Sequence, residues 1–394
     1  MHRIDTTTAV PNAHGTGKSG FTDGTVPTVA PTQLNASWFD DIQEEICNVI
    51  EGESVALVAG ARQLTTALQR LAGQSVGALA TSRWTPRTTP NALAYTGMCW
   101  SSDLGLFVGV APLGTGGQDF IRSADGITWT VATTIPVTAH QWWTAAWSPS
   151  LALFAAISQD GASLTKCFAT SPDGITWTGH DGPNINASNL SSICWSPSQA
   201  VFVAVGGGGT YTSADGTTWL ARTNATANCL SVCWSPTANG TGLFCAVNAA
   251  GAITTSPDGI TWTIRYASSP RTWKSVCWSP ELSIFCVVAN DNTTAYAITT
   301  SKDGITWTGQ VIAGSLIRAW TSVAWSPAFC MFVAVASNGT QNSQIIVSND
   351  GVNWSPRTSS SVRQWQAVAW ADGLSMFAAI AQDGTTSNQI MTSL

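Results

Sequence analysis

Short runs rich in Val, Ile, Thr and aromatic residues follow one another from about residue 81 to the C-terminus, separated by Pro, Asp and Gly. KSVCWS, VFVAV, AITTS and ITWTIR are four such runs. This pattern is typical of strands joined by tight turns. Because the same kinds of run recur in the same order, the pattern predicts a unit of four strands, A to D, that is repeated along the chain.

Two sequence markers give the length of this repeat. The pattern Ser-x-Asp-Gly-x-x-Trp recurs about every 45 residues, the size of a four-stranded propeller blade. Its aspartates are Asp125, Asp173, Asp215, Asp258, Asp303 and Asp350. A second Trp, usually followed by Ser, marks strand A at Trp100, Trp147, Trp195, Trp234, Trp278, Trp325 and Trp370.

The two ends of the repeat region predict how the ring closes. The chain ends in QIMTSL, which supplies a strand C without a following strand D. The missing strand lies before the first strand A, in TSRWTPRT, where Trp84 takes the place of the motif Trp. We therefore predict an all-β, seven-bladed β-propeller over residues 81–394, whose last blade combines three C-terminal strands with one N-terminal strand and leaves no exposed edge.

The repeated motif resembles the Asp-box, or BNR repeat, of sialidases and other propellers. In that family the Asp side chain bonds the backbone of the C–D turn and the Trp packs under the blade, so the resemblance implies a structural role for the six aspartates. It also implies that any ligand binds on the opposite face, where the D–A and B–C loops lie. An Asp-Gly turn alone explains the motif.

The propeller sequence does not favour a sialidase. It contains a single glutamate, Glu281, and its strand D arginines occupy a repeat position rather than forming a converging trio. We predict that the protein is not an enzyme. A glycosidase that uses paired carboxylates stays open as an alternative, because three aspartates fall in predicted B–C loops: Asp160, Asp291 and Asp383.

The composition argues against several classes of function. The net charge of −6 argues against nucleic-acid binding, and no apolar stretch is long enough to insert into a membrane. The chain has ten cysteines without CxxC spacing. Four of them precede a strand A Trp at positions where other repeats have Ala, so we interpret them as small buried residues and predict neither metal nor cofactor.

The first eighty residues lack the strand repeat of the rest of the chain. Residues 1–34 carry Thr, Gly and Pro without periodicity, which indicates an extended arm. Residues 35–80 contain two amphipathic stretches, and the first places apolar residues on one helical face. A short isolated helix needs a partner for such a face, so we expect an intermolecular interface. Its residues are Trp38, Phe39, Ile42 and Ile46.

This N-terminal region is similar to the N-terminal segment of tailed-bacteriophage tail fibres and related virion proteins. The similarity rests on RIDT, GKSGFTDG and LNASWFDDIQEEICNVIE, in that order. It implies that residues 1–80 dock to other virion or tail proteins, often as a trimer, while the C-terminal part faces the host. We therefore expect a virion protein that displays its propeller for host-surface or glycan binding. A polysaccharide depolymerase and a ligand-free decoration or scaffold protein are the alternatives.

A ligand site is expected on the face of the D–A and B–C loops, since loops such as ANDNTTA and AQDGTTSN suit hydrogen bonding to sugars. Five residues before the strand A Trp, five repeats carry an aromatic ring: Tyr95, Trp142, Trp273, Trp320 and Trp365. His140, Arg271 and Arg318 stand nearby. The hypothesis is that at least two of these rings are exposed and stack on sugars. The alternative is that they fill the wedge between blades.

Overall fold

The computed structural model describes residues 10–11, 19–20, 46, 48, 63–112, 118–132, 140–159, 166–183, 189–222, 228–267, 269–292, 296–312 and 316–393. The chain divides into two units, Met1–Val76 and Gly77–Leu394. In the first unit, β1 (Val10–Pro11) pairs antiparallel with β2 (Ser19–Gly20), and Ile46 is helical and half-buried. Most of the predicted arm, together with Trp38, Phe39 and Ile42, lies outside the described residues.

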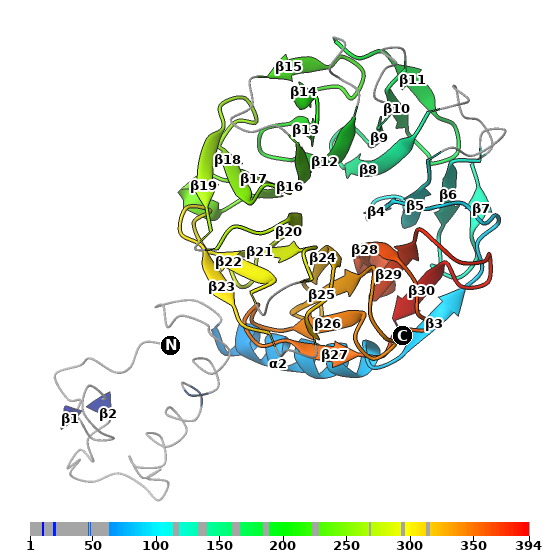
Figure 1. The fold of residues 1–394 in the computed structure, drawn as a ribbon. Helices are drawn as coiled ribbons and strands as arrows, with labels where there is room; N and C mark the ends of the chain where they lie inside the picture. Colours follow the sequence, from blue (N-terminus) through cyan, green and yellow to red (C-terminus); the bar gives the residue numbers. More distant parts are fainter. Residues whose placement is uncertain are drawn as a thin grey trace, which may run out of the picture. The chain divides into compact units, whose positions relative to one another are not determined.

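The second unit is a ring of seven four-stranded antiparallel sheets, as the repeat predicts (Figure 1). The A strands surround the centre of the ring in blade order: β4 (Gly97–Ser101), β8 (Trp142–Ser148), β12 (Leu190–Ser196), β16 (Cys229–Ser235), β20 (Trp273–Ser279), β24 (Trp320–Ser326) and β28 (Trp365–Ala371). The B strands come next: β5 (Leu106–Val110), β9 (Leu153–Ser158), β13 (Val201–Gly206), β17 (Leu243–Asn248), β21 (Ile284–Ala289), β25 (Met331–Ala336) and β29 (Met376–Ala381). Blades are numbered 1 to 7 from β4.

The outer half of each blade contains strands C and D. The C strands are β6 (Phe120–Ser123), β10 (Phe168–Ser171), β14 (Gly209–Ser213), β18 (Ala252–Ser256), β22 (Ile298–Ser301), β26 (Ile345–Ser348) and β30 (Ile390–Ser393). The D strands are β7 (Thr130–Val131), β11 (Thr178–His180), β15 (Leu220–Arg222), β19 (Thr263–Tyr266), β23 (Thr308–Gln310), β27 (Ser355–Arg357) and β3 (Trp84–Arg87). Two short 3₁₀ turns, η1 (Ala238–Gly240) and η3 (Asp372–Leu374), lie between strands A and B.

Blade 7 closes the ring in the predicted way. Its strand order is β28-β29-β30-β3, so the outermost strand comes from the N-terminal side of the chain. Trp84 pairs with Ser393 and Arg87 with Ile390. The Arg87 guanidinium also donates to Thr392 Oγ1 at 2.8 Å. Both ends of the repeat region are therefore held in one sheet.

The Asp-Gly turns are held by the aspartate side chain. In blade 4, Asp258 Oδ1 accepts hydrogen bonds from the Ile260 and Thr261 N–H groups, both at 2.8 Å, and from Ser256 Oγ at 3.0 Å. Gly259 follows with φ +72, a conformation that favours glycine. All six motifs share the bonds from the two N–H groups and from the serine hydroxyl. The motif is thus a turn-forming device in this protein.

Blades pack on one another through aromatic and small apolar residues. Phe120 of blade 1 stacks on Trp177 of blade 2, and Phe168 of blade 2 stacks on Trp219 of blade 3, each with ring centroids 4.1 Å apart. The cysteines of the described residues are free thiols and are buried or partly buried, which agrees with their interpretation as small apolar residues. Burial raises the pKa of the Cys277 thiol well above its usual value.

The helix α2 (Gln63–Ala80) leads into the propeller. Its last turn lies close to blade 6, because a Cβ at Gly77 would come within 2.6 Å of Phe329 Cβ. Thr81 Oγ1 then lies 3.6 Å from Met331 Sδ. Among the helical residues that the structure describes, no helix combines the length and apolar character needed to cross a membrane.

Candidate ligand site at the mouth of the central channel

A β-bulge near the start of strand A sets the geometry at the centre of the ring. In blades 2 to 7 the pairing of strand A with strand B shifts by one residue, for example between Trp273 and Ser275 in blade 5. A bulge inserts an unpaired residue and redirects its side chain. The six bulge residues are Trp143, Ser191, Leu230, Lys274, Thr321 and Gln366.

These residues, together with Thr96 at the same place in blade 1, all line one pocket of about 140 Å³. All seven A strands surround the centre of the ring (Figure 1). The lining residues stand at the starts of these strands, so the pocket lies at that end of the central channel. We call the seven residues the bulge ring. The pocket lies on the face away from the Asp-Gly turns, where the sequence predicts a ligand site.

Four serines, one in each of blades 3 to 6, directly follow the bulge residues in the chain and join neighbouring blades. Each of the four serine hydroxyls accepts a hydrogen bond from an N–H group of the next blade, at 3.1–3.2 Å. The serines are Ser192, Ser231, Ser275 and Ser322, and all four line the pocket. Since each oxygen acts as acceptor, its own O–H hydrogen stays available as a donor towards the pocket.

Lys274 is the charged member of the bulge ring. Its side chain is half-buried, and burial lowers the pKa of the ammonium group. No aspartate or glutamate is among the described residues that line the pocket. Two other members are committed to the protein: Thr96 Oγ1 donates to the Trp143 carbonyl and Thr321 Oγ1 to the Trp365 carbonyl. The other side chains of the bulge ring belong to Lys274, Gln366, Trp143, Ser191 and Leu230.

The hypothesis of exposed aromatic rings is wrong. Their exposed fractions are 0% or 1%: Tyr95, Trp142, Trp273, Trp320 and Trp365. They fill the space between blades, where Trp142 lies 5.5 Å from the Phe120 ring, centroid to centroid. In blades 2, 5, 6 and 7 the Trp directly precedes the bulge and turns into the core, whereas the bulge residue after it lines the channel mouth. The side chains that line the channel mouth therefore stand one residue after the predicted positions.

Two of the three polar residues predicted beside the rings, Arg271 and Arg318, contact loops of their own blades. Arg271 Nε lies 3.7 Å from Asp291 Oδ2. Arg318 Nε donates to Ser343 Oγ at 3.0 Å, and His140 is buried. Arg363, which was not among the predicted residues, takes the same place in blade 7 and donates to Asn388 Oδ1. Its constant spacing from the strand A Trp was the available signal.

The carboxylates considered for a hydrolase also have structural partners. Asp383 Oδ1 accepts the Gln364 N–H group at 2.6 Å, and Glu281 Oε2 accepts the Trp325 indole N–H at 2.6 Å. Asp291 faces Arg271, and Asp160 lies outside the described residues. Within the described part of the chain, no group of three or more His, Cys, Asp or Glu residues could hold a metal ion.

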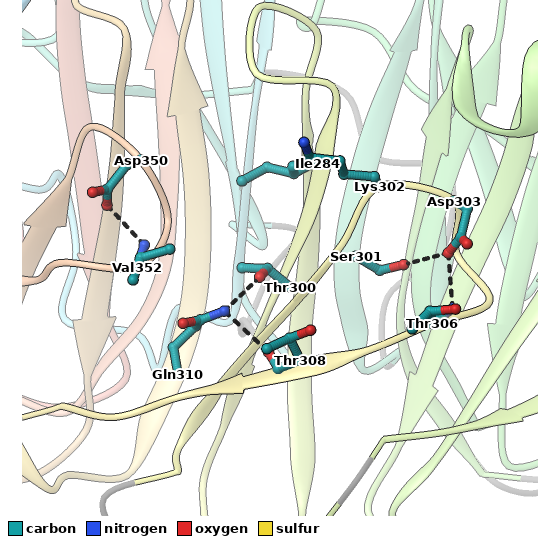
Figure 2. A pocket seen from close by; sticks show the side chains of 10 residues that line it. All are labelled: Ile284, Thr300, Ser301, Lys302, Asp303, Thr306, Thr308, Gln310, Asp350 and Val352. Carbon is teal, nitrogen blue, oxygen red and sulfur yellow. Dashed lines mark hydrogen bonds between the residues drawn. The ribbon is translucent and has the colours of Figure 1, made fainter. Parts of the chain in front are cut away.

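A second cleft, of about 400 Å³, lies beside the Asp-Gly turns of blades 5 and 6. Figure 2 shows that its polar groups are bonded mainly to their own turns and strands. Asp303 accepts from Ser301 and Thr306, and Gln310 Nε2 donates to Thr300 Oγ1 at 2.8 Å. Several polar groups of this cleft are therefore committed to the turns and strands that carry them.

The fold defines the class: a seven-bladed β-propeller of four-stranded antiparallel blades. A streptogramin B lyase is similar with a TM-score of 0.62 and 7% identity, over 79% of this chain and 97% of that chain. YCF48 bound to D1 peptide is similar with a TM-score of 0.57 and 14% identity, over 78% of this chain and 95% of that chain. The Cps50 (Swd1) propeller domain of Myceliophteria thermophila is similar with a TM-score of 0.58 and 11% identity, over 79% of this chain and 100% of that chain. At these identities the similarity shows the fold alone.

No family model matches the chain. Among curated proteins, the chain is 48% identical over 73 residues to the Uncharacterized protein StfP of Escherichia coli strain K12. The match covers 18% of this chain and 35% of that protein, so it spans about a third of the relative's length.

Proposed function

We propose that the protein is a non-catalytic attachment protein of a bacteriophage virion, and that it binds a host-surface glycan at the mouth of its central channel. The observation that carries the binding role is the bulge ring. Six blades place a bulge at the same position, and the six bulge residues all differ. The neighbouring positions vary less, with Trp before the bulge in four of the six blades and Ser after it in four. A uniform scaffold with a varied set of central side chains suits recognition.

The carboxylates favour binding over hydrolysis. A glycosidase needs two carboxyl groups on either side of the scissile bond. In the described loops, Asp291 faces an arginine and Asp383 bonds backbone, while Glu281 bonds an indole. These partners hold the carboxylates in place as parts of the fold, which supports the attachment role over the depolymerase alternative.

The virion part of the proposal rests on the N-terminal sequence. The arm and helix of residues 1–80 resemble those of tail fibre proteins, in which this segment docks to the particle. We propose that the same segment docks here to other tail proteins, with a trimer as the oligomeric state. The apolar face of Trp38, Phe39, Ile42 and Ile46 would form the interface.

The experiment for the binding role uses the full-length protein, E. coli cells as the first host panel, and polysaccharide released from them. Trp143→Ala tests the channel mouth, and Tyr266→Ala is the matched control because Tyr266 is an aromatic residue of the outermost strand with 70% exposure. We expect cell binding without shortening of the polysaccharide, weakened by Trp143→Ala and unchanged by Tyr266→Ala. Shortening of the polysaccharide would support the depolymerase alternative. An absence of both binding and shortening would support the ligand-free scaffold alternative.

The experiment for the anchor follows incorporation into particles. The double variant Phe39→Asp and Ile46→Asp places charges on the proposed interface, which should prevent assembly while leaving the propeller folded. Normal incorporation of this variant would refute the docking role of residues 1–80.

A further inference from the structure

The bulge ring and the four serines that join blades 3 to 7 present an excess of hydrogen-bond donors to the pocket. Ser192, Ser231, Ser275 and Ser322 each use the hydroxyl oxygen to accept a backbone N–H group. A hydroxyl that already accepts a hydrogen bond is polarised and becomes a stronger donor. The four O–H groups therefore favour an acceptor in the pocket.

Lys274 gives the same pocket a positive charge. Its ammonium group carries three donors and accepts none. The described lining contains no carboxylate that would neutralise it. The half-buried position costs the charged form hydration, and burial accordingly lowers the pKa of Lys274. A bound anion would restore a favourable partner for this charge, and its bond to the ammonium would be charge-assisted.

The remaining lining and the size of the pocket restrict the anion. Trp143 and Leu230 add apolar surface, which suits the face of a sugar ring. A volume of about 140 Å³ corresponds to about five water molecules. This space admits one acidic substituent with part of its ring, whereas a polysaccharide chain would have to remain outside the mouth.

Resting on the proposed function, we infer that the glycan unit which enters the channel mouth carries a carboxylate, bound by Lys274 and the serine hydroxyls, with Trp143 against the sugar ring. The ligand class is thus an acidic sugar at a branch or chain end. Gln366 and Ser191 complete the polar lining.

The test compares Lys274→Gln with Lys302→Gln in the full-length protein. Both variants remove one positive charge, but Lys302 lies in the Asp-Gly turn of blade 5, away from the channel mouth. The probes are sodium glucuronate and glucose, and their binding is measured by ligand-observed NMR and calorimetry. A second pair of probes is host polysaccharide before and after chemical reduction of its carboxyl groups. Thermal melting checks that both variants are folded.

We expect glucuronate and the untreated polysaccharide to bind, and glucose and the reduced polysaccharide to bind much more weakly. Loss of a charge-assisted bond should weaken binding by about ten- to hundred-fold in Lys274→Gln, with no change in Lys302→Gln. Equal binding of reduced and untreated polysaccharide, or unchanged binding by a folded Lys274→Gln variant, would overturn the acidic ligand and leave glycan attachment standing. Failure of the wild-type protein to bind any host cell or polysaccharide would instead refute the proposed function, and this inference with it.

Discussion

Replacement of Trp320 separates a packing role from a binding role at the positions where the sequence suggested sugar-stacking rings. Trp320 is fully buried, and it belongs to a hydrophobic cluster that joins blades 5 and 6. Its indole N–H has no hydrogen-bond partner among the described residues. The side chain therefore contributes through packing alone.

The magnitude follows from this environment. A buried Trp removes up to about 250 Å² from water, which corresponds to about 6 kcal/mol as an upper bound. Measured replacements of buried Trp or Phe by Ala cost about 3–5 kcal/mol, because the cavity collapses in part. We expect about 4 kcal/mol for Trp320→Ala. Trp320→Phe keeps most of the ring and removes an unpaired donor, so about 1–2 kcal/mol is expected.

The assay is equilibrium urea unfolding of the full-length protein, with the m-value compared between variants so that a shift in midpoint reports stability. Val311→Ala serves as the surface control, since Val311 is 64% exposed and its replacement should change the free energy of unfolding by less than about 0.5 kcal/mol. Trp320→Ala within about 1 kcal/mol of wild type, combined with lost host binding, would refute the packing argument.

Three further predictions concern turns, blade contacts and pH. Gly304→Ala should lower the free energy of unfolding by about 2 kcal/mol or more in urea unfolding, because φ is +71 and the new Cβ would lie 2.6 Å from Leu243 Cδ2. Gly105→Ala is the control, since φ is +58 but the space around it is open, and it should lower the free energy of unfolding by only about 1 kcal/mol. Equal losses in the two variants would refute the clash. Ser275→Ala should cost about 1–3 kcal/mol in the same assay, because it leaves the buried Val323 N–H group without its acceptor, and a neutral result would refute the inter-blade bond. Burial acts to raise the pKa of Asp125, but the hydrogen bonds from Thr128, Ile127 and Ser123 lower it to about 2, below its usual 3.8. The other five motif aspartates also have lowered pKa values. The stability that these carboxylates contribute is therefore present above about pH 4 and is lost as the pH falls towards 2. The melting temperature should drop over that pH range, and the drop should be smaller in an Asp125→Asn variant than in the wild type.

The fold was predictable because each blade is specified locally and repeatedly. The Asp-Gly turns define the C–D hairpins, the strand A Trp marks the inner strand, and Trp84 revealed the borrowed strand of blade 7. Each of these signals lies within one blade or one strand, so it can be recognised in the sequence without knowledge of distant contacts.

The channel mouth was harder to predict because a bulge changes which way a side chain points. Strict alternation from Trp278 back along strand A does not show that the chain gains a residue between Trp273 and Ser275. Lys274 therefore looked like an ordinary strand residue. The signal was indirect: the bulge position differs in every blade except for the two threonines. The residue before it is Trp in four of the seven blades, and the residue after it is Ser in four.

The shared blade 7 also sets the order of events during synthesis. A ribosome produces strand β3 before all the other blade strands, and its partner β30 after all of them. Until then β3 has no sheet to join, and blade 1 has no neighbour on one side. A chain that stops before β30 would lack the strand between β29 and β3 and would remain an open ring with unpaired edges. Completion of the ring thus requires that translation has passed β30.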